Sequence, residues 1–492
     1  MAGTLRTHSA LRSGALTALA QLVLALAAAG AGALLAQKFG RNAETDGFLA
    51  AYGVYLVLVL AAQAFRMVVV PDLTRAAAAG RLAGESRAYA VAFLGLAVPV
   101  SVVVAVLSAP LGDLITGSLP HRSAHVAGRA LAIVVPAAFV QLLAALAASS
   151  LAAVDSYGTA AAGFAVGGLV GLAVFAALAS SVGIVALAWG LAVNATLALA
   201  IPLVGLWRRG LLTGPWPARL RPGYRLANLL EGAAVPLALQ GCYLLALRFA
   251  AKLGVGSVTS FSYAYLAAST LVAATAFSLG VISSAPLTRR GLDEERAGEH
   301  VVHAAWVSLS LVGAAAGVFA LVGGSIVRVV LGDAYSGHVG SELGHLVAYL
   351  APWMVAWVGF AVTFPLVFVA GRRHVLVPLA AAGFLVCIPL GLALRSLWGL
   401  PGIAIAVGIA TLVVSLGLMA ALSRRSFGIA VVGLARLSLA IGSAAALAFG
   451  GLGVALPAAA AAALGLVVYA ALILATRSLG LSAAWTYVRG LH

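Results

Sequence analysis

The sequence predicts an all-α polytopic membrane protein with about 14 transmembrane helices. Hydrophobic residues make up 63% of the 492 residues and charged residues only 9%, whereas a soluble domain has about 25% charged residues. Apolar runs of about 20 residues recur along the chain, and that length crosses the hydrocarbon core of a bilayer as a helix. The short alternating strands of a closed barrel, the other structure that spans membranes, are not found in the sequence.

Charged or Pro/Gly-rich breaks separate the apolar runs and define the predicted helices in order. The fifth and sixth helices are divided only by the segment "ASSVGI" (179–184). Prolines 99, 136, 202 and 236 lie inside predicted helices, where each removes a backbone hydrogen bond and favours a kink. The predicted spans are 14–36, 48–70, 88–109, 125–151, 157–179, 182–206, 226–251, 256–286, 302–327, 343–370, 375–394, 400–422, 428–450 and 454–476.

The basic residues predict the orientation of these helices. The net charge of +16 is typical of some nucleic-acid-binding proteins, but here the arginines lie in short segments between predicted helices. With the N-terminus inside, the cytoplasmic segments contain nineteen arginines, and the outer segments contain six basic residues. This positive-inside bias predicts a multi-pass membrane protein with cytoplasmic N- and C-termini and no nucleic-acid partner.

No catalytic or metal-binding motif is visible. The sequence has no Walker A lysine motif, no HExxH and no carboxylate pair spaced for acid–base chemistry. Cys242 and Cys387 lie in apolar segments without CxxC or Cys/His spacing, so neither a disulfide framework nor a metal site is indicated. The sequence therefore predicts a transporter rather than an enzyme. It needs no cofactor and is driven by an H⁺ or Na⁺ gradient, the membrane potential or the substrate gradient.

Two short motifs recur in the same order. "VVPDLTRAAAAGR" (69–81) is similar to "SSAPLTRRGLDEER" (283–296), and "LGDLITG" (111–117) is similar to "LGDAYSG" (331–337). The offset of about 215 to 220 residues corresponds to six helices, which predicts a parallel repeat of two lobes, as in some transporters. The expected organisation is an N-terminal lobe (1–207), a cytoplasmic linker (208–225), a second lobe (226–422), and two further helices with a cytoplasmic tail (423–492).

Four features resemble the MurJ/MviN group of the MATE-like (MOP) exporter superfamily. They are "KFGRNAETDGFLAAY" (38–52), the "P-x-L" exit from the second helix (71–73), the block from "GSVTSFSYAYL" (256–266) to "LGVISSAPLTRR" (279–290), and "IVRVVLGDAYSG" (326–337). The resemblance implies fourteen helices in a 6+6+2 arrangement. It also implies an alternating-access flippase that moves a polyprenyl-diphosphate-linked precursor, chiefly lipid II, from the inner to the outer leaflet. In the family, the two extra helices form a lipid-facing groove.

The chain departs from this family at charged positions. The resemblance implies arginines that line a central cavity and engage the substrate diphosphate, a role that the planar guanidinium suits. Of the family's charged set, only Asp46 is present in register. The replaced positions are Ala31 and Gly32 in the first helix, Val57 and Leu58 in the second, and Tyr265 and Leu266 in the eighth.

Charged residues inside predicted spans are candidate functional groups, because burying a charge in a bilayer is expensive. We predict that Arg66 and Arg129 bind the anionic substrate and that Arg248 is a coupling or gate residue. For Arg66 and Arg248, the alternative is a side chain that snorkels to the membrane interface. Glu231 is predicted to couple transport by exchanging H⁺ or Na⁺ or by pairing with Arg66. Its alternative is an interfacial pair with Arg225, about nine ångströms away along the helix.

Polar residues in the spans extend the predicted site. Gln63, Asn194 and Tyr263 are candidate substrate-binding groups, and their alternative role is to hold membrane helices together by hydrogen bonds. The run "GFAVGGLVG" (163–171) predicts close helix packing.

Asp46 follows a charged loop in which Lys38, Arg41 and Glu44 require no partner other than solvent. It is expected either to cap the second helix or to form an outer-gate contact.

Three functional classes remain open. The first is a flippase for a lipid-linked cell-wall or polysaccharide precursor. The second is a related polysaccharide translocase or MATE-type drug/ion antiporter. The third is a non-transporting homologue that scaffolds envelope assembly. The expected partners are accordingly a lipid-linked glycan precursor, membrane lipids and cell-envelope assembly proteins.

Overall fold

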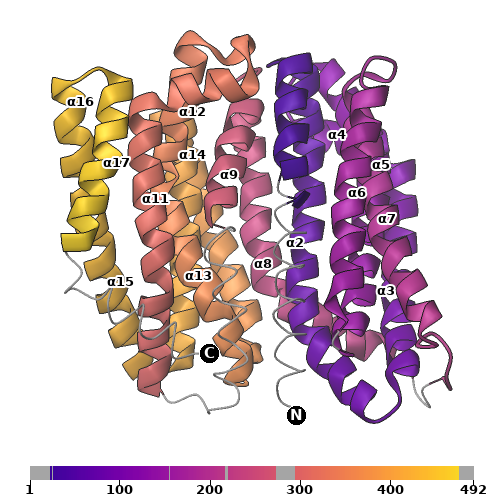
Figure 1. Ribbon diagram of the computed structural model, residues 1–492. Coiled ribbons are helices and arrows are strands. Elements are labelled where there is room, and N and C mark those ends of the chain that lie inside the picture. Colours follow the sequence, from indigo (N-terminus) through magenta and orange to yellow (C-terminus); the bar gives the residue numbers. More distant parts are fainter. Residues whose placement is uncertain (1–22, 25, 155, 217–219, 273–293, 476–492) are drawn as a thin grey trace. The chain divides into compact units, whose positions relative to one another are not determined.

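The computed structural model of the chain describes residues 23–24, 26–154, 156–216, 220–272 and 294–475. All regular secondary structure in these residues is helical, which confirms the predicted fold class (Figure 1). Ten of the described helices are long and apolar enough to cross a membrane. Residues 14–22 of the first predicted span lie outside the described residues. Residues 273–286 of the eighth span also lie outside them. The predicted start of the last span at residue 454 is wrong, because residues 454 and 455 belong to α16 (Gly451–Ala455) and the last helix, α17, is Ala458–Ala475.

The chain forms two compact units, which we call unit 1 and unit 2. Unit 1 contains residues 1–240 and 254–256, and unit 2 contains residues 241–253 and 257–492. In unit 1, α5 is the central helix and packs against α2, α3, α4 and α7, while α6 packs along α7. A short helix, Leu26–Phe39, precedes α2. The other helices of unit 1 are α2 (Ala43–Ala78), α3 (Leu82–Val106), α4 (Ser108–Thr116), α5 (His121–Ala152), α6 (Tyr157–Leu178), α7 (Ala186–Arg208) and the first part of α8 (Pro222–Ala251).

In unit 2, α11 packs against α12, α13 and α15, and α13 packs against α14. A column of aromatic rings follows α13, where Trp353, Trp357, Phe360, Phe364 and Phe368 contact one another in turn. The helices are α9 (Ser257–Val272), α11 (Glu294–Leu331), α12 (Gly337–Tyr349), α13 (Ala351–Val369), α14 (Leu376–Leu422), α15 (Arg424–Ala445), α16 (Gly451–Ala455) and α17.

Two other predicted spans differ from the observed helices, one in its number of helices and one in where it ends. The span 343–370 is two helices, α12 and α13, because Pro352 lies in the first turn of α13, where a proline starts a helix without losing a hydrogen bond. The span 88–109 ends earlier, since α3 ends at Val106 and α4 begins at Ser108. By contrast, α14 contains the break predicted between 394 and 400, at Gly399 with φ of 61°. The "ASSVGI" boundary is also confirmed, because α6 ends at Leu178 and α7 begins at Ala186.

Glycine ends α2 and positions the helix that follows. Gly80 has φ of 68°, a left-handed conformation that glycine adopts without steric cost. The N–H of Gly80 donates to the carbonyl of Ala77 (3.0 Å), and the N–H of Arg81 donates to that of Ala76 (2.8 Å). These two bonds satisfy the last carbonyls of α2 in a Schellman motif. The chain therefore reverses within a few residues and starts α3 at Leu82.

The helices α6 and α7 approach closely at glycines of the predicted run 163–171. A Cβ atom added to Gly171 would lie 2.5 Å from the carbonyl oxygen of Gly190, and one added to Gly190 would lie 2.5 Å from that of Gly171. Small residues allow this backbone contact, as they do in other membrane helix pairs. The prediction of close packing from "GFAVGGLVG" is confirmed.

Candidate functional site

The start of α2 is fixed by Asn42. Its side-chain oxygen accepts the N–H groups of Glu44 (2.9 Å) and Thr45 (3.0 Å), so Asn42 is the N-cap of the helix. The interpretation of Asp46 as the cap is therefore wrong. Asp46 lies one turn further along α2 and is fully buried.

Asp46 and Arg41 together hold the backbone of Gly256. The N–H of Gly256 donates to Oδ2 of Asp46 (2.5 Å), and Nε of Arg41 donates to the carbonyl oxygen of Gly256 (2.9 Å). Charged partners make both hydrogen bonds stronger than neutral ones. We call this set of three residues the Gly256 closure. The expectation that Arg41 is only solvated is wrong, because its guanidinium is committed to this carbonyl.

Gly256 is required at this position by both conformation and space. Its φ of 88° is one that residues with a side chain rarely adopt. A Cβ atom there would lie 2.3 Å from Nε of Arg41. Glycine at position 256 thus allows the carboxylate of Asp46 and the guanidinium of Arg41 to approach its backbone directly.

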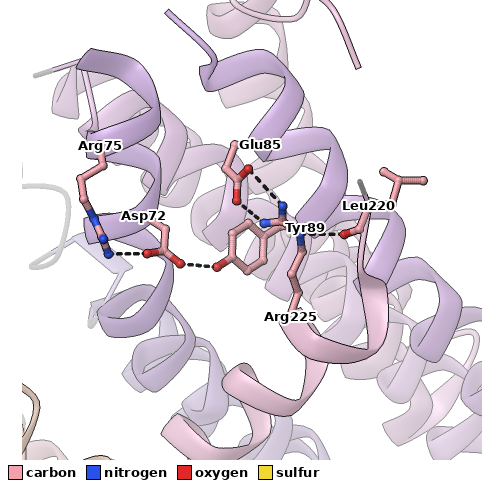
Figure 2. Close-up of polar contacts among 6 residues, drawn as sticks. All are labelled: Asp72, Arg75, Glu85, Tyr89, Leu220 and Arg225. Atoms are coloured by element: carbon pink, nitrogen blue, oxygen red, sulfur yellow. Dashed lines mark hydrogen bonds and ion pairs between the residues drawn. The ribbon is translucent and has the colours of Figure 1, made fainter. Parts of the chain in front are cut away.

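A second polar cluster lies at the other end of α2 and is centred on Arg225, in the first turns of α8 (Figure 2). The guanidinium of Arg225 forms a two-bond ion pair with Glu85 of α3: Nη1 donates to Oε1, and Nη2 donates to Oε2 (3.1 Å). The side chains are 13% and 24% exposed, respectively. Because both are largely removed from solvent, the pair is screened less than a surface ion pair.

Tyr89 links this ion pair to α2. The Arg225 guanidinium lies 4.8 Å from the centroid of the Tyr89 ring, within the range of a cation–π contact. The Tyr89 hydroxyl donates to Oδ2 of Asp72 (2.6 Å), whose Oδ1 accepts a bond from Nη2 of Arg75 (2.6 Å). Tyr89 itself is 1% exposed. We call Asp72, Arg75, Glu85, Tyr89 and Arg225 the Arg225 network; Figure 2 shows its chain of contacts across α2, α3 and α8.

The turn before α8 is strained and held by the same arginine. Arg221 has φ of 41° and is the non-glycine residue with positive φ in the described part of the chain. Such a conformation stores roughly 1–3 kcal/mol and persists only where neighbouring contacts fix it. One such contact is the bond from Nε of Arg225 to the carbonyl of Leu220 (3.0 Å).

Glu231 does not form either predicted pair. Arg225 is bound to Glu85, so the interpretation of Glu231 as the partner of Arg225 is wrong. Within the described residues, Glu231 has no ion pair with Arg66. The Glu231 side chain is partly exposed on α8 in unit 1.

Arg66 and Arg129 lie at different levels of unit 1. Oγ of Ser123 on α5 donates to the carbonyl oxygen of Ala43 on α2 (2.6 Å), so the two helices begin at the same level. Arg66 follows Ala43 by 23 residues and Arg129 follows Ser123 by six, which puts Arg66 and Arg129 about 25 Å apart along the helices at 1.5 Å per residue. One diphosphate group cannot bridge that separation. Arg66 is partly buried, and Arg129 is exposed.

The predicted polar residues have separate positions. Asn194 lies in the contact between α6 and α7, where Cβ atoms at Gly167 and Gly171 would meet its atoms at 2.7 and 3.0 Å. Its Oδ1 is buried without a hydrogen-bond partner among the described residues. Tyr263 is buried in unit 2 and packs edge-to-face on Tyr335, with ring centroids 5.6 Å apart. The side chain of Gln63 lies outside the described residues.

Aromatic packing occupies one position where the sequence resemblance to the MurJ/MviN group implies a charged side chain. Tyr265 stacks on Tyr243 with ring centroids 4.1 Å apart and contacts Trp353 at 4.7 Å. It is 2% exposed. Unit 2 therefore has a packed aromatic contact at this position instead of the charged pair that the resemblance implies.

The remaining candidate ligands do not cluster. No group of three or more His, Cys, Asp or Glu side chains in the described residues could hold a metal ion. Cys242 and Cys387 are buried free thiols, and Sγ of Cys387 lies 4.0 Å from the carbonyl oxygen of Cys242. Arg248 lies near the end of α8 in unit 2 with its Nη1 atom buried.

Solved structures share this fold along most of the chain. The lipid II flippase MurJ in an inward closed conformation matches with a TM-score of 0.69 and 15% identity, covering 94% of this chain and 99% of the flippase. An inward-facing multidrug resistance MATE family transporter of the MOP superfamily matches with a TM-score of 0.60 and 13% identity, covering 85% and 95% of the two chains. A MOP superfamily transporter from Pyrococcus furiosus also gives a TM-score of 0.60 at 13% identity, covering 87% and 95%.

No protein-family model and no curated protein sequence matches the chain. At these low identities the structural matches show the fold alone. The chain has the fold shared by the MurJ flippase and the MATE transporters of the MOP superfamily.

Proposed function

We propose that this protein is an alternating-access membrane transporter that moves a polyprenyl-diphosphate-linked cell-wall or polysaccharide precursor from the inner to the outer leaflet. The observation that carries the proposal is the match of nearly the whole chain to a lipid II flippase. The Gly256 closure supports it, because Asp46, which the sequence resemblance singles out, has a specific backbone partner. The proposed location is the bacterial inner membrane with both termini in the cytoplasm, in line with the positive-inside bias.

In this orientation, the Gly256 closure is the outer gate and the Arg225 network is the inner gate. Each gate lies at one end of α8. Arg225 of the inner gate is in the first turns of this helix, and Gly256 of the outer gate comes five positions after its last residue, Ala251. Alternating access requires each gate to open in turn. Polar contacts suit such gates because water can replace their hydrogen bonds when they separate.

Arg66, Arg129 and Glu231 retain proposed roles as separate groups. Because Arg66 and Arg129 lie too far apart for one diphosphate, we propose that they contact different parts of an extended substrate. Glu231 remains a proposed coupling residue for H⁺ or Na⁺, with the membrane potential as an alternative energy source. The proposed partners are the lipid-linked glycan and membrane lipids.

A second candidate function is a related polysaccharide translocase or a MATE-type drug/ion antiporter. The packing of Tyr265 between Tyr243 and Trp353 favours it, since this position lacks the charge expected of a diphosphate site. A scaffold for envelope assembly is a further candidate, favoured by the replaced arginines at the family's charged positions.

The test is reconstitution of the purified protein into vesicles containing a fluorescent polyprenyl-diphosphate-linked sugar. We expect the labelled lipid to become accessible to a membrane-impermeant quencher faster than in empty vesicles. Uptake of a cationic dye against an imposed H⁺ or Na⁺ gradient, without lipid movement, would identify an antiporter. Neither activity under any imposed gradient would contradict transport and leave the scaffold.

A further inference from the structure

Two arginines of unit 2 lie on helices that pack together at the end of α8. Arg248 is in the last turn of α8, and Arg395 is on α14, four residues before the break at Gly399. The guanidinium of Arg395 lies 6.0 Å from the ring centroid of Phe249, the residue that follows Arg248. A Cβ atom at Gly391 would lie 2.4 Å from this ring, so α8 and α14 are in close contact here. Arg248 and Arg395 therefore lie on two helices that contact each other at this point.

Each arginine has a buried nitrogen that finds no hydrogen-bond partner in the described part of the chain. Nη1 of Arg248 and Nη1 of Arg395 make no hydrogen bond to any described residue. Neither side chain forms an ion pair with a carboxylate in this part of the chain. A buried charged donor that is left unsatisfied is destabilising, more so than a neutral one. Two such donors in one region indicate that a ligand supplies the missing acceptors.

The location of the pair suggests an anion at the membrane interface. In the proposed orientation the end of α8 faces outward, where the sequence places few basic residues, yet Lys252 adds a third cation there. Beside Arg395, the side chains of Leu397 and Trp398 are 69% and 58% exposed. An exposed tryptophan next to basic residues is typical of the headgroup level of a bilayer.

Simple snorkelling does not account for this arrangement. A snorkelling arginine extends its nitrogens into water or headgroups, whereas here an Nη1 atom of each arginine is covered by protein. The Arg395 guanidinium lies against the ring of Phe249, at the contact between α8 and α14. Guanidinium groups in this setting match the oxygens of a phosphate, which accept several N–H donors at once.

We propose that Arg248 and Arg395 form a binding site for the phosphate group of a lipid in the outer leaflet. This inference rests on the proposed orientation and adds a site on the release side of transport. Two lipids carry the required chemistry: a bulk anionic phospholipid and the diphosphate-linked product of transport. In both, the phosphate oxygens accept the free N–H groups while the acyl or polyprenyl chain lies along the exposed Leu397 and Trp398.

The site is tested by lipid binding to the purified full-length protein in detergent, followed by native mass spectrometry. The probes are phosphatidylglycerol, a long-chain polyprenyl diphosphate and, as a phosphate-free control, diacylglycerol. We expect Arg248→Gln and Arg395→Gln each to weaken binding of at least one phosphate lipid by about tenfold or more, the effect of losing a charged hydrogen bond. Arg328→Gln is the matched control, since Arg328 is an exposed arginine in the last turn of α11.

The outcome separates the two lipid sources. Weakened binding of phosphatidylglycerol alone assigns the site to bulk lipid, and weakened binding of the polyprenyl diphosphate assigns it to the transported product. Unchanged binding of both lipids in both variants, or equal binding of diacylglycerol, would overturn the proposal. Arg248→Lys and Arg395→Lys keep the charge and provide folded variants if the glutamines prevent folding; we expect them to bind phosphate lipid more weakly than wild type. Because binding is measured without transport, a failure of the flipping assay would not count against this site.

Discussion

The guanidinium of Arg225 is bound through two nitrogens to the carboxylate of Glu85, although the two residues are 140 positions apart in the chain. The pair joins the start of α8 to the start of α3, and the Tyr89 ring and hydroxyl extend it to Asp72 on α2. Three helices are thus tied together at one end of unit 1 by a connected set of polar contacts. This relationship leads to the first two predictions.

Breaking the Arg225–Glu85 pair is expected to destabilise the protein. In Glu85→Gln the guanidinium loses a charged acceptor while it remains largely buried, so we expect a loss of about 1–3 kcal/mol in the free energy of unfolding. Arg225→Gln should have a similar effect, and the double variant should lose less than the sum of the two. Thermal unfolding in detergent measures all three, with Arg81→Gln, an exposed arginine at the start of α3, as the control. Strictly additive losses would show that the two side chains do not interact.

Removing the Tyr89 hydroxyl tests the link to α2. Tyr89→Phe keeps the ring under Arg225 but leaves Oδ2 of Asp72 without the 2.6 Å bond. We expect a loss of about 1–2 kcal/mol, because the hydrogen bond is to a charged group. The matched control is Tyr224→Phe, since the Tyr224 side chain is 66% exposed. Equal melting temperatures of the two variants would contradict a role for this hydroxyl.

Much of the helix order was predictable from the sequence, because the length and composition of an apolar run determine whether it spans a bilayer. The contacts of the Arg225 network could not be predicted from the sequence. Arg225 lies among arginines that the positive-inside pattern already explained, so nothing marked it as half of an ion pair. One signal was present: Glu85 is the acidic residue between Arg81 and Arg87 in a segment otherwise basic. Its partner could not be identified, since sequence separation carries no information about which helices meet.

Asp46 illustrates the same limit at the other end of α2. Its position near a helix start favoured capping, and the family motif marked it as functional. The cap is instead Asn42, four residues earlier, whose side chain is better placed to reach the first free N–H groups. Asp46 and Arg41 both bind the backbone of Gly256, which lies more than two hundred residues away in the chain. Only the tertiary structure brings these residues together.

Replacing Gly256 should damage the Gly256 closure specifically. Gly256→Ala places a methyl group 2.3 Å from Nε of Arg41 at a φ of 88°. We expect backbone strain of roughly 1–3 kcal/mol and, in addition, displacement of Arg41. Gly254→Ala is the control, because Gly254 also has positive φ (111°) but has no atom within 4 Å of an added Cβ. If both variants unfold at the same temperature, the contact with Arg41 contributes nothing.

The contact between α6 and α7 gives an independent test of packing. In Gly171→Ala the added methyl group meets the Gly190 carbonyl at 2.5 Å, so the helices must separate, at a cost of about 1–3 kcal/mol. In Gly95→Ala, on α3, an added Cβ meets nothing within 4 Å. That variant should be unchanged or up to about 1 kcal/mol more stable, because alanine favours helix over glycine. Opposite changes in melting temperature are the expected result, and a stable Gly171→Ala would contradict the close approach.

The proposed function requires that the protein moves a lipid-linked precursor and that the Arg225 network opens for it to do so. The most direct measurement is leaflet exposure of the labelled precursor by the variant Glu85→Cys/Arg225→Cys, with Cys242 and Cys387 replaced by alanine. A reducible bis-methanethiosulfonate reagent links the two introduced thiols, and the same vesicles are assayed before and after reduction. We expect no flipping above empty vesicles while the link is present and recovery of flipping once the link is reduced. Flipping at the same rate in both states, or in neither state while the wild-type protein is also inactive, would contradict the proposal.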